Sequence, residues 1–427
     1  MRSNARLLPL AVALISGFSF LPALSGSLLN WDDNVNFVDN PAYRGLGFEQ
    51  LQWAATSVLF GHYIPLTRLT WSANYAVGGL DPWGYHLVNV ALHAANATIF
   101  YFVARRLLAA AVAGDSPRAA RDPALAMGAA AAALVFGVHP LRVEPVAWIS
   151  ARADLLCALF TLLAVWAYLR AVDPGGPARP QGIALCTVAF AAAVLSKGIA
   201  LPLPATLLLL DVYPLGRLSR LGWRALVREK LPLLLVMVAG AATVAYAVHH
   251  GAALTPMAAH GPVARITAVI YACVMSLARF FWPASLSPLY EMPARISPLE
   301  LRFGSAVIAA GLLTAVLIAL RRRWPAALVA WVFSVLMLAP TTAALRQGVD
   351  LAPDRYSYLA GAGYAMLAGG ASIAMIRLVR HGGFSRATAG LLAVCTLAGL
   401  AGLGAMSWSY AEVWRDSESL WRWAVEV

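Results

Sequence analysis

Two adjacent acids, Asp32 and Asp33, follow the first apolar run of the chain. Partial burial and the repulsion between neighbouring carboxylates raise the pKa of one of them towards neutrality, which suits a group that takes a proton from a hydroxyl nucleophile. The alternative is that the two acids only cap or solvate the loop. Acids outnumber arginines throughout the segment from Asn30 to Trp83, which we expect to be an outer loop.

A second group of ionisable residues lies between two later apolar runs. His139 and Glu144 occupy the connector, and Arg152 and Asp154 stand at the start of the next run. Ionisable groups at such a depth are costly to bury, so they indicate a functional site unless they only pair with one another. A structural arginine–carboxylate pair that braces the connector is therefore the alternative.

Two further cations stand where they could bind an anion. Lys197 lies between two apolar runs with almost no loop, so its ammonium has to reach either the membrane interface or a buried anion. Arg355 precedes Tyr356 at the start of another run. Its guanidinium could bind a phosphate through two hydrogen bonds, or it could pair with its neighbour Asp354.

A row of polar residues recurs at steps of three and four and so shares one helix face: His86, Asn89, His93 and Asn96. Hydrogen bonding between helices explains such a row, and a metal site is the alternative. The sequence contains no zinc-hydrolase, P-loop or serine-hydrolase motif. Zinc-hydrolase, NTPase and serine-hydrolase chemistry therefore lack support, whereas a divalent ion held by the outer carboxylates stays open.

The elements that position these residues are apolar helices. The 427 residues are 60% hydrophobic and 12% charged, whereas a soluble domain has roughly 25% charged residues. This composition excludes a water-soluble globule, and continuous apolar runs predict an all-α, polytopic membrane protein. The runs span approximately residues 7–29, 85–108, 125–138, 155–169, 183–195, 199–215, 231–248, 303–320, 326–339, 356–376 and 387–406.

The basic residues gather in alternate connectors, as the positive-inside rule requires, so the net charge of +12 does not indicate nucleic-acid binding. Arg2 and Arg6 place the N-terminus inside and the loop after Leu29 outside, whether the first run is a span or a signal peptide. If the stretch Arg265 to Pro283 is an outer interfacial or re-entrant helix, about eleven spans satisfy the rule. Twelve spans with one violated connector are the alternative.

We expect residues 1–406 to form the membrane domain and residues 407–427 to form an outer amphipathic tail. Taken in order, the polar motifs resemble those of the transmembrane and tetratricopeptide-repeat O-mannosyltransferases and their bacterial relatives, which are GT-C glycosyltransferases. The resemblance extends from about Leu29 to Trp423. The motifs are Trp31-Asp32-Asp33 with Asn40-Pro41, Tyr63-Ile64-Pro65-Leu66-Thr67, Gly84-Tyr85-His86-Leu87-Val88-Asn89, His139-Pro140, Glu144, Arg152-Ala153-Asp154, Ser196-Lys197 and Arg355-Tyr356.

The resemblance implies a GT-C-like fold and inverting transfer of a sugar from a polyprenyl or dolichyl phosphate to an acceptor hydroxyl. Asp32 would be the general base, with Asp33 in support. Position and charge make Lys197, Arg152 and Arg355 the candidates that bind the donor phosphate. The remaining pocket residues would be His139, Glu144, Asp154, Tyr356 and His86.

The resemblance further implies an active site on the periplasmic, extracytoplasmic or lumenal face of the bilayer. The acceptor would be a protein or a glycan, and the resemblance also implies a mechanism with no metal and no cofactor besides the lipid-phosphate sugar. Two features depart from the family pattern: Gly198 follows Lys197 where an acid is common, and the sequence reaches Val427 where the tetratricopeptide repeats usually begin. We therefore expect acceptor binding to need a further segment or a separate repeat-domain partner. A non-enzymatic transporter or flippase for lipid-linked saccharides is the alternative function.

Overall fold

The computed structural model describes residues 7–113, 122–172, 176–250, 261–339 and 350–427. In these ranges the secondary structure is helical, apart from two isolated β-bridges, Leu59 with His62 and Glu291 with Asp350. The all-α prediction is therefore confirmed. Arg2 and Arg6, on which the predicted orientation depends, lie outside the described residues.

Twelve apolar helical segments account for all eleven expected runs and for the stretch 265–283, within the ranges described. Seven helices are long and apolar enough to cross a membrane: α4 (Pro82–Ala113), α7 (Arg152–Ala171), α11 (Leu231–His250), α12 (Pro262–Phe281), α13 (Leu301–Ala319), α16 (Ala362–Arg380) and α17 (Arg386–Val413). An eighth candidate is bent by 61° between α5 (Pro123–Gly137) and the segment Pro140–Ala147, which contains α6 (Val143–Ala147). Shorter apolar helices are α1 (Leu8–Phe18), α8 (Pro180–Ser196), α9 (Leu203–Val212) and α14 (Pro325–Ala339).

The protein is thus a polytopic helical membrane protein. By length and composition α12 belongs with the spanning helices, although we expected that stretch to be interfacial or re-entrant. The number of spans stays a prediction. Helix α17 also continues without a break past the expected boundary at Met406 and ends at Val413.

Prolines and polar caps explain where several helices begin. Helices α5, α8 and α12 each have a proline in the first turn, where its missing N–H would have had no partner within the helix. The side chain of Asp122 accepts a hydrogen bond from the amide of Ala124 at the start of α5, and Ser385 accepts one from Thr388 at the start of α17.

Small residues bring the central helices together. A Cβ atom added at Gly128 of α5 would lie 2.7 Å from the carbonyl oxygen of Gly369 of α16, so the backbones of the two helices touch. Polar residues of α4 fasten it to its neighbours: His93 contacts the hydroxyl of Tyr358 at 2.7 Å, and Asn96 donates to the carbonyl of Leu155 at 3.0 Å. Hydrogen bonding between helices therefore explains most of the polar row on this helix.

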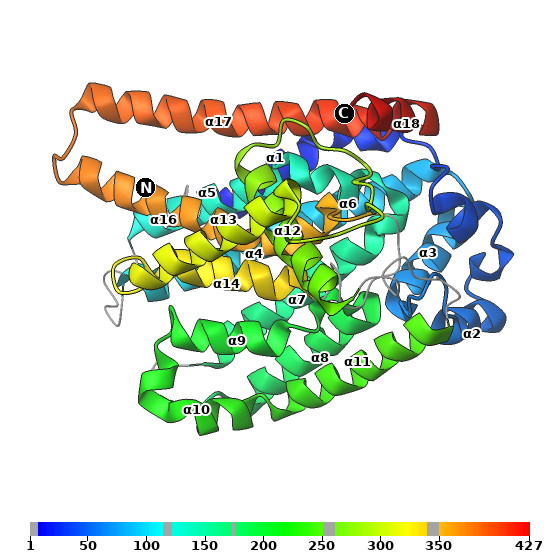
Figure 1. Cartoon of the computed structure of the whole chain (residues 1–427), viewed down its shortest axis with the longest axis horizontal. Helices are drawn as coiled ribbons and strands as arrows, with labels where there is room; N and C mark the ends of the chain where they lie inside the picture. Colours follow the sequence, from blue (N-terminus) through cyan, green and yellow to red (C-terminus); the bar gives the residue numbers. More distant parts are fainter. Residues whose placement is uncertain (1–6, 114–121, 173–175, 251–260, 340–349) are drawn as a thin grey trace.

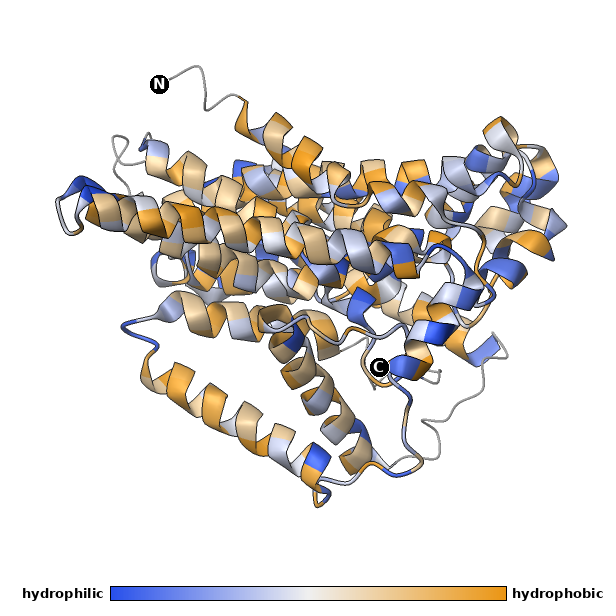
Figure 2. Ribbon diagram, turned by 90° about the horizontal axis from the view of Figure 1, so that it is seen from above, coloured by the Kyte–Doolittle hydropathy of each residue, from blue (hydrophilic) through white to orange (hydrophobic). Residues whose placement is uncertain are grey.

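The long helices lie side by side, and several of the remaining short helices lie at one end of the bundle (Figure 1). At that end α2 (Phe48–Thr56) and α3 (Pro65–Gly78) form the loop after α1, and α18 (Ser417–Glu426) lies near them. The turns from α13 to α14 and from α16 to α17 lie at the opposite end. Figure 2 shows apolar residues along the helices and hydrophilic residues mainly at their ends, as a bilayer requires.

A buried charge cluster fixes α10 (Arg217–Glu229), the helix between α9 and α11. Asp211 binds the guanidinium of Arg217 at 2.9 Å and the ammonium of Lys230 at 2.5 Å, and Tyr168 donates to the same carboxylate. Arg217 also binds Glu229 at 2.8 Å. The five side chains form ion pairs and hydrogen bonds with one another, which explains how charged groups are tolerated inside an apolar bundle.

Candidate functional site

A cavity of about 80 Å³ lies where the first loop meets α7, α8 and the turn before α15 (Ser357–Ala360). Five of the ten predicted site residues line it: Asp32, Asp154, Lys197, Arg355 and Tyr356. These residues come from four segments far apart in the sequence, so the fold brings together two acids and two cations that sequence spacing alone did not join. Aromatic walls are formed by Phe60, Trp71 and Trp148.

The two adjacent acids have different surroundings. Asp33 is fully buried, and its carboxylate accepts hydrogen bonds from the amide of Leu29 at 3.0 Å and from the amide and hydroxyl of Ser150 at 3.2 and 2.5 Å. Asp32 is half-buried, and within the described ranges its carboxylate accepts no hydrogen bond. Asp33 therefore fixes the loop, and Asp32 is left open to the cavity.

Burial alters the proton affinity of both acids. It raises the pKa of Asp33 to about 6, although the hydrogen bonds from Ser150 and Leu29 favour the ionised form. Burial also raises the pKa of Asp32 above 3.8, while the positive charges of Arg355 and Lys197 act to lower it. The two cations are thus close enough for their charges to affect Asp32.

Lys197 ends α8 and precedes a short 3-10 turn, Gly198–Ala200. Its ammonium lies 2.6 Å from the carboxylate of Asp154 and 5.2 Å from the centre of the Tyr356 ring. Since the connector is too short to carry the side chain to the interface, the lysine meets a buried anion, which was one of the two expected outcomes.

Arg355 is held by Glu144 of α6. The carboxylate accepts a hydrogen bond from the backbone amide of Arg355 at 2.8 Å and pairs with its guanidinium, which also lies 3.7 Å from Asp350. The alternative pairing of Arg355 with its neighbour Asp354 does not occur. Glu144 is 2% exposed at its side chain, so it acts on the cavity through Arg355.

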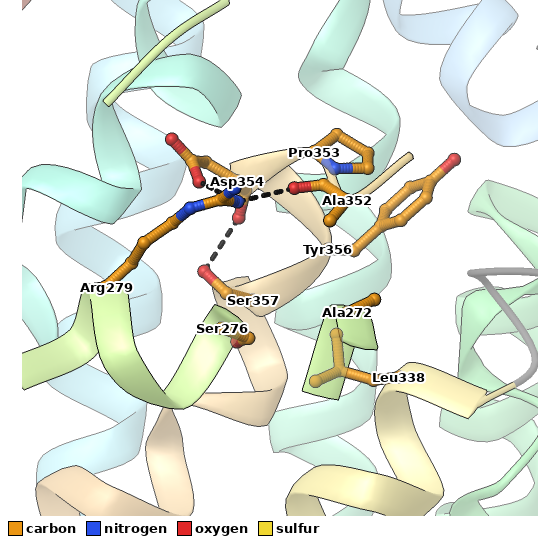
Figure 3. A pocket seen from close by; sticks show the side chains of 9 residues that line it. All are labelled: Ala272, Ser276, Arg279, Leu338, Ala352, Pro353, Asp354, Tyr356 and Ser357. Carbon is orange, nitrogen blue, oxygen red and sulfur yellow. Dashed lines mark hydrogen bonds and ion pairs between the residues drawn. The ribbon is translucent and has the colours of Figure 1, made fainter. Parts of the chain in front are cut away.

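Asp354 points to the other side of the same turn and pairs with Arg279 of α12 at 3.1 Å (Figure 3). The hydroxyl of Tyr290 donates to its second oxygen at 3.1 Å, and burial raises the pKa of Asp354 to about 7. A space of about 10 Å³ beside this pair holds no more than one water. Tyr356 lines this space as well as the larger cavity, so the turn separates the two.

Three predicted site residues lie away from the cavity. Arg152 is fully buried and donates to the side chains of Asn89 at 2.9 Å and Asn74 at 2.5 Å, and to the carbonyl of Tyr85 at 2.9 Å. Most of its N–H groups are therefore occupied in joining α3, α4 and α7. Arg152 thus braces these helices and does not line the cavity, so its contact with a phosphate stays a prediction, and among the described residues it makes no arginine–carboxylate pair.

The two predicted histidines lie against the backbone of other segments. His139 contacts the carbonyl of Phe280 at 2.8 Å through Nε2, and its ring stacks on the Phe280 ring at 4.7 Å. His86 lies against the chain at Gly26, where an added Cβ would be 2.8 Å from Nε2. Neither ring lines the cavity.

Sequence reasoning missed several residues of the cavity, above all Arg68 and Ser150. Arg68 is one of only two arginines in an acid-rich loop, which was a usable signal. Ser150 carries no such signal, because a serine beside an apolar run is common. Within the described ranges, no three His, Cys, Asp or Glu side chains gather as metal ligands would, and metal use stays a prediction.

Comparison with known proteins gives local matches. Over 108 residues the chain is 40% identical to mouse "Protein O-mannosyl-transferase TMTC2", which is 25% of this chain and 11% of the mouse protein. It is 36% identical over 159 residues to Drosophila melanogaster Tmtc1 (37% and 16%), and 40% identical over 113 residues to human TMTC4 (26% and 15%). This chain is similar in sequence to the TMTC protein O-mannosyl-transferases.

The similarity to the TMTC proteins covers 25% to 37% of this chain, less than the expected range from Leu29 to Trp423. The chain spans 11% to 16% of the length of these relatives. No family model matches it. A solved structure of ArnT from Cupriavidus metallidurans, bound to undecaprenyl phosphate, aligns over 100% of this chain and 78% of that one with 16% identity and a TM-score of 0.43. That score is too low to establish a shared fold.

Proposed function

We propose that the chain is a GT-C-type glycosyltransferase that transfers a mannose-like sugar from a polyprenyl or dolichyl phosphate to an acceptor hydroxyl, with inversion at the anomeric carbon. One observation carries the proposal: the carboxylate of Asp32, which accepts no hydrogen bond from the described residues, shares a cavity with Lys197 and Arg355. A carboxylate opposite two cations suits a reaction in which a hydroxyl loses a proton and a phosphate departs. The names of the TMTC relatives support the reaction class.

In the proposed reaction Asp32 accepts the proton of the acceptor hydroxyl. The hydroxyl oxygen forms a bond to the anomeric carbon, and the bond from that carbon to the phosphate oxygen breaks. The lipid phosphate leaves with the electron pair of the broken bond. Because Asp33 is held by Leu29 and Ser150, its role is to fix the loop so that Asp32 faces the acceptor.

The leaving phosphate gains negative charge as the bond breaks, so the cations of the cavity stabilise the transition state. Of the predicted phosphate ligands, Lys197 and Arg355 line the cavity; Lys197 pairs with Asp154, and Arg355 pairs with Glu144 and, at 3.7 Å, with Asp350. Those partners hold the two cations in place before the substrate arrives, which lowers the cost of organising the site. The donor itself is the only small molecule that the proposal requires, with no metal and no cofactor.

We assign the site to the outer face of the membrane, periplasmic or lumenal, on the charge pattern of the connectors. A protein Ser or Thr hydroxyl is the proposed acceptor, as the names of the relatives suggest. A tetratricopeptide-repeat partner is the proposed route by which such an acceptor is presented.

The test is to incubate purified protein in detergent with dolichyl-phosphate mannose and a Ser/Thr-rich peptide, and to follow both released dolichyl phosphate and mannosylated peptide. We expect the two products in equal amounts from the unaltered protein and neither from Asp32→Asn. Movement of the lipid across a vesicle membrane without either product would instead support a transporter and overturn the proposal.

A further inference from the structure

We infer that Arg68 is a further anion-binding residue of the cavity. The inference rests on the proposed function for the identity of the anion, which is then the phosphate of the polyprenyl-phosphate donor. Nothing in the sequence motifs singled out Arg68, and the case for it comes from its burial, its partners and its position.

Arg68 is a buried charge without a counter-charge. The residue is 1% exposed, and its guanidinium donates to the carbonyl oxygens of Ser57 and His62, the latter at 3.1 Å. Its Nε–H is buried with no hydrogen-bond partner, and in the described part of the chain no carboxylate pairs with the side chain. An arginine removed from water without an anion is strongly unfavourable, so the site is arranged to receive one.

The other cations of the cavity differ from Arg68 in this respect. Lys197 and Arg355 each have a carboxylate at hand, Asp154 and Glu144. Arg142 and Arg152 resemble Arg68 in being buried and, among the described residues, in lacking a carboxylate, but neither lines the cavity. Arg68 therefore gives the cavity a positive charge that no carboxylate in the described part of the chain neutralises.

Its position places that charge beside the predicted phosphate ligands. The hydroxyl of Thr67 donates to the carbonyl of Ser196 at 3.0 Å, which ties the first turn of α3 to the end of α8. Arg68 and Lys197 are the next residues along each segment, and both line the cavity. The guanidinium also lies 5.3 Å from the centre of the Trp53 ring, and this cation–π contact helps to hold it in place.

Arg68 has a second task that any test must separate from binding. The two carbonyls that it holds flank a tight turn, in which Leu59 and His62 exchange backbone hydrogen bonds at 3.2 and 2.9 Å. Phe60 in this turn has a φ of 49°, which is unfavourable for an aromatic residue. Loss of Arg68 could therefore loosen the turn without any direct effect on an anion.

The test measures binding of undecaprenyl phosphate and of neutral undecaprenol to purified protein in detergent, by native mass spectrometry, with melting temperature recorded for each variant. We expect Arg68→Gln to weaken binding of undecaprenyl phosphate by about tenfold or more, as loss of a charge-assisted hydrogen bond requires, and to leave undecaprenol binding unchanged. Arg68→Lys, which keeps a charge to hold the turn, should weaken phosphate binding by a smaller factor.

Arg44→Gln is the matched control. Arg44 lies in the same loop and donates to the carbonyl of Val38 at 2.6 Å, but it does not line the cavity. We expect this variant to bind undecaprenyl phosphate as the unaltered protein does. If folded Arg68→Gln binds undecaprenyl phosphate as tightly as the unaltered protein does, the inference is overturned and the proposed function stands. Failure of the unaltered protein to prefer the phosphate over undecaprenol would overturn both.

Discussion

The indole rings of Trp31 and Trp421 stack face to face, with centroids 4.8 Å apart and planes 5° apart. Trp31 immediately precedes Asp32, and Trp421 lies on α18 near the end of the chain. The backbone amide of Asn30 also donates to the hydroxyl of Ser417 at 2.8 Å. The segment that carries the proposed base is therefore supported by the tail, so residues 407–427 are part of the packing around the site.

Replacement of this stack should affect both stability and turnover. We expect Trp421→Ala to lower the free energy of unfolding by about 2 kcal/mol and the transfer rate by about tenfold, because Asp32 is less well positioned. The measurements are denaturant unfolding in detergent and initial rate. Trp408→Ala is the control, since Trp408 contacts Phe18 at 5.3 Å and should affect stability alone. An unchanged rate in folded Trp421→Ala would contradict the supporting role.

Substitution of the two adjacent acids should have different effects, on the transfer rate at Asp32 and on stability at Asp33. Asp32→Asn should reduce the transfer rate by about 10²- to 10⁴-fold and leave the melting temperature unchanged, since among the described residues its carboxylate accepts no hydrogen bond. Asp33→Asn should lower stability by about 1–3 kcal/mol, because the contacts with Leu29 and Ser150 weaken. The reverse pattern in rate and melting data would exchange the two assignments.

Activity and stability should depend on pH in opposite directions. Asp32 works as a base only when ionised, and burial raises its pKa above 3.8, so the rate should rise with pH through a limb above that value. The pKa of Asp33 is raised to about 6, so its contribution to stability is full below 3.8 and is lost as pH rises through 6. Rates and melting temperatures measured from about pH 4 to about pH 8 test both. A rate that does not change with pH would exclude a carboxylate base.

Glu144 should act through Arg355 on donor binding. Glu144→Gln removes the charge that holds the guanidinium, so we expect KM for the lipid donor to rise by about tenfold. Glu144→Asp keeps the charge and should restore part of the affinity. Asp122→Asn, which disturbs the pairs with Arg377 and Arg380 away from the cavity, is the control. Equal KM values for Glu144→Gln and the unaltered protein would rule out this positioning role.

The buried cluster around Asp211 should matter for stability alone. Asp211→Asn leaves Lys230 and Arg217 with less negative charge inside the bundle, and breaking a buried pair costs about 3–5 kcal/mol. We expect a lower melting temperature, with normal transfer by the fraction that remains folded. A variant as stable as the unaltered protein would show that the cluster is replaceable by neutral groups.

Composition and apolar runs were sufficient to predict the fold class, because a bilayer demands helices of a certain length. They were less informative about α12, whose 20 residues satisfy the criteria for a span although the charge rule favoured an interfacial position. The length of a helix and the charges of its connectors are separate constraints on membrane topology. The sequence alone does not decide which of the two prevails for α12.

The site was predictable where local geometry left few choices. The connector at Lys197 is too short to carry the side chain to water, so a buried anion was one of the two expected partners. The ammonium indeed pairs with Asp154. Arg355 and Asp354 are neighbours that do not pair, because Glu144, 211 positions away, approaches from α6. Position and charge predict that Arg152 binds a phosphate, but its contacts with Asn89 and Asn74 could not be inferred from sequence spacing, because these residues lie on other helices.

The turn that carries Asp354 and Arg355 is anchored in two directions at once. Asp354 is bound to Arg279 of α12 and Arg355 to Glu144 of α6, so neighbouring residues are fastened to two separate helices. A sliding movement of α12 against α6 must either rupture one of these attachments or drag the turn along. Sideways entry of the proposed lipid donor between those helices would therefore shift the Arg355 guanidinium, so that entry of the donor and alignment of the proposed reacting groups would be linked through this turn.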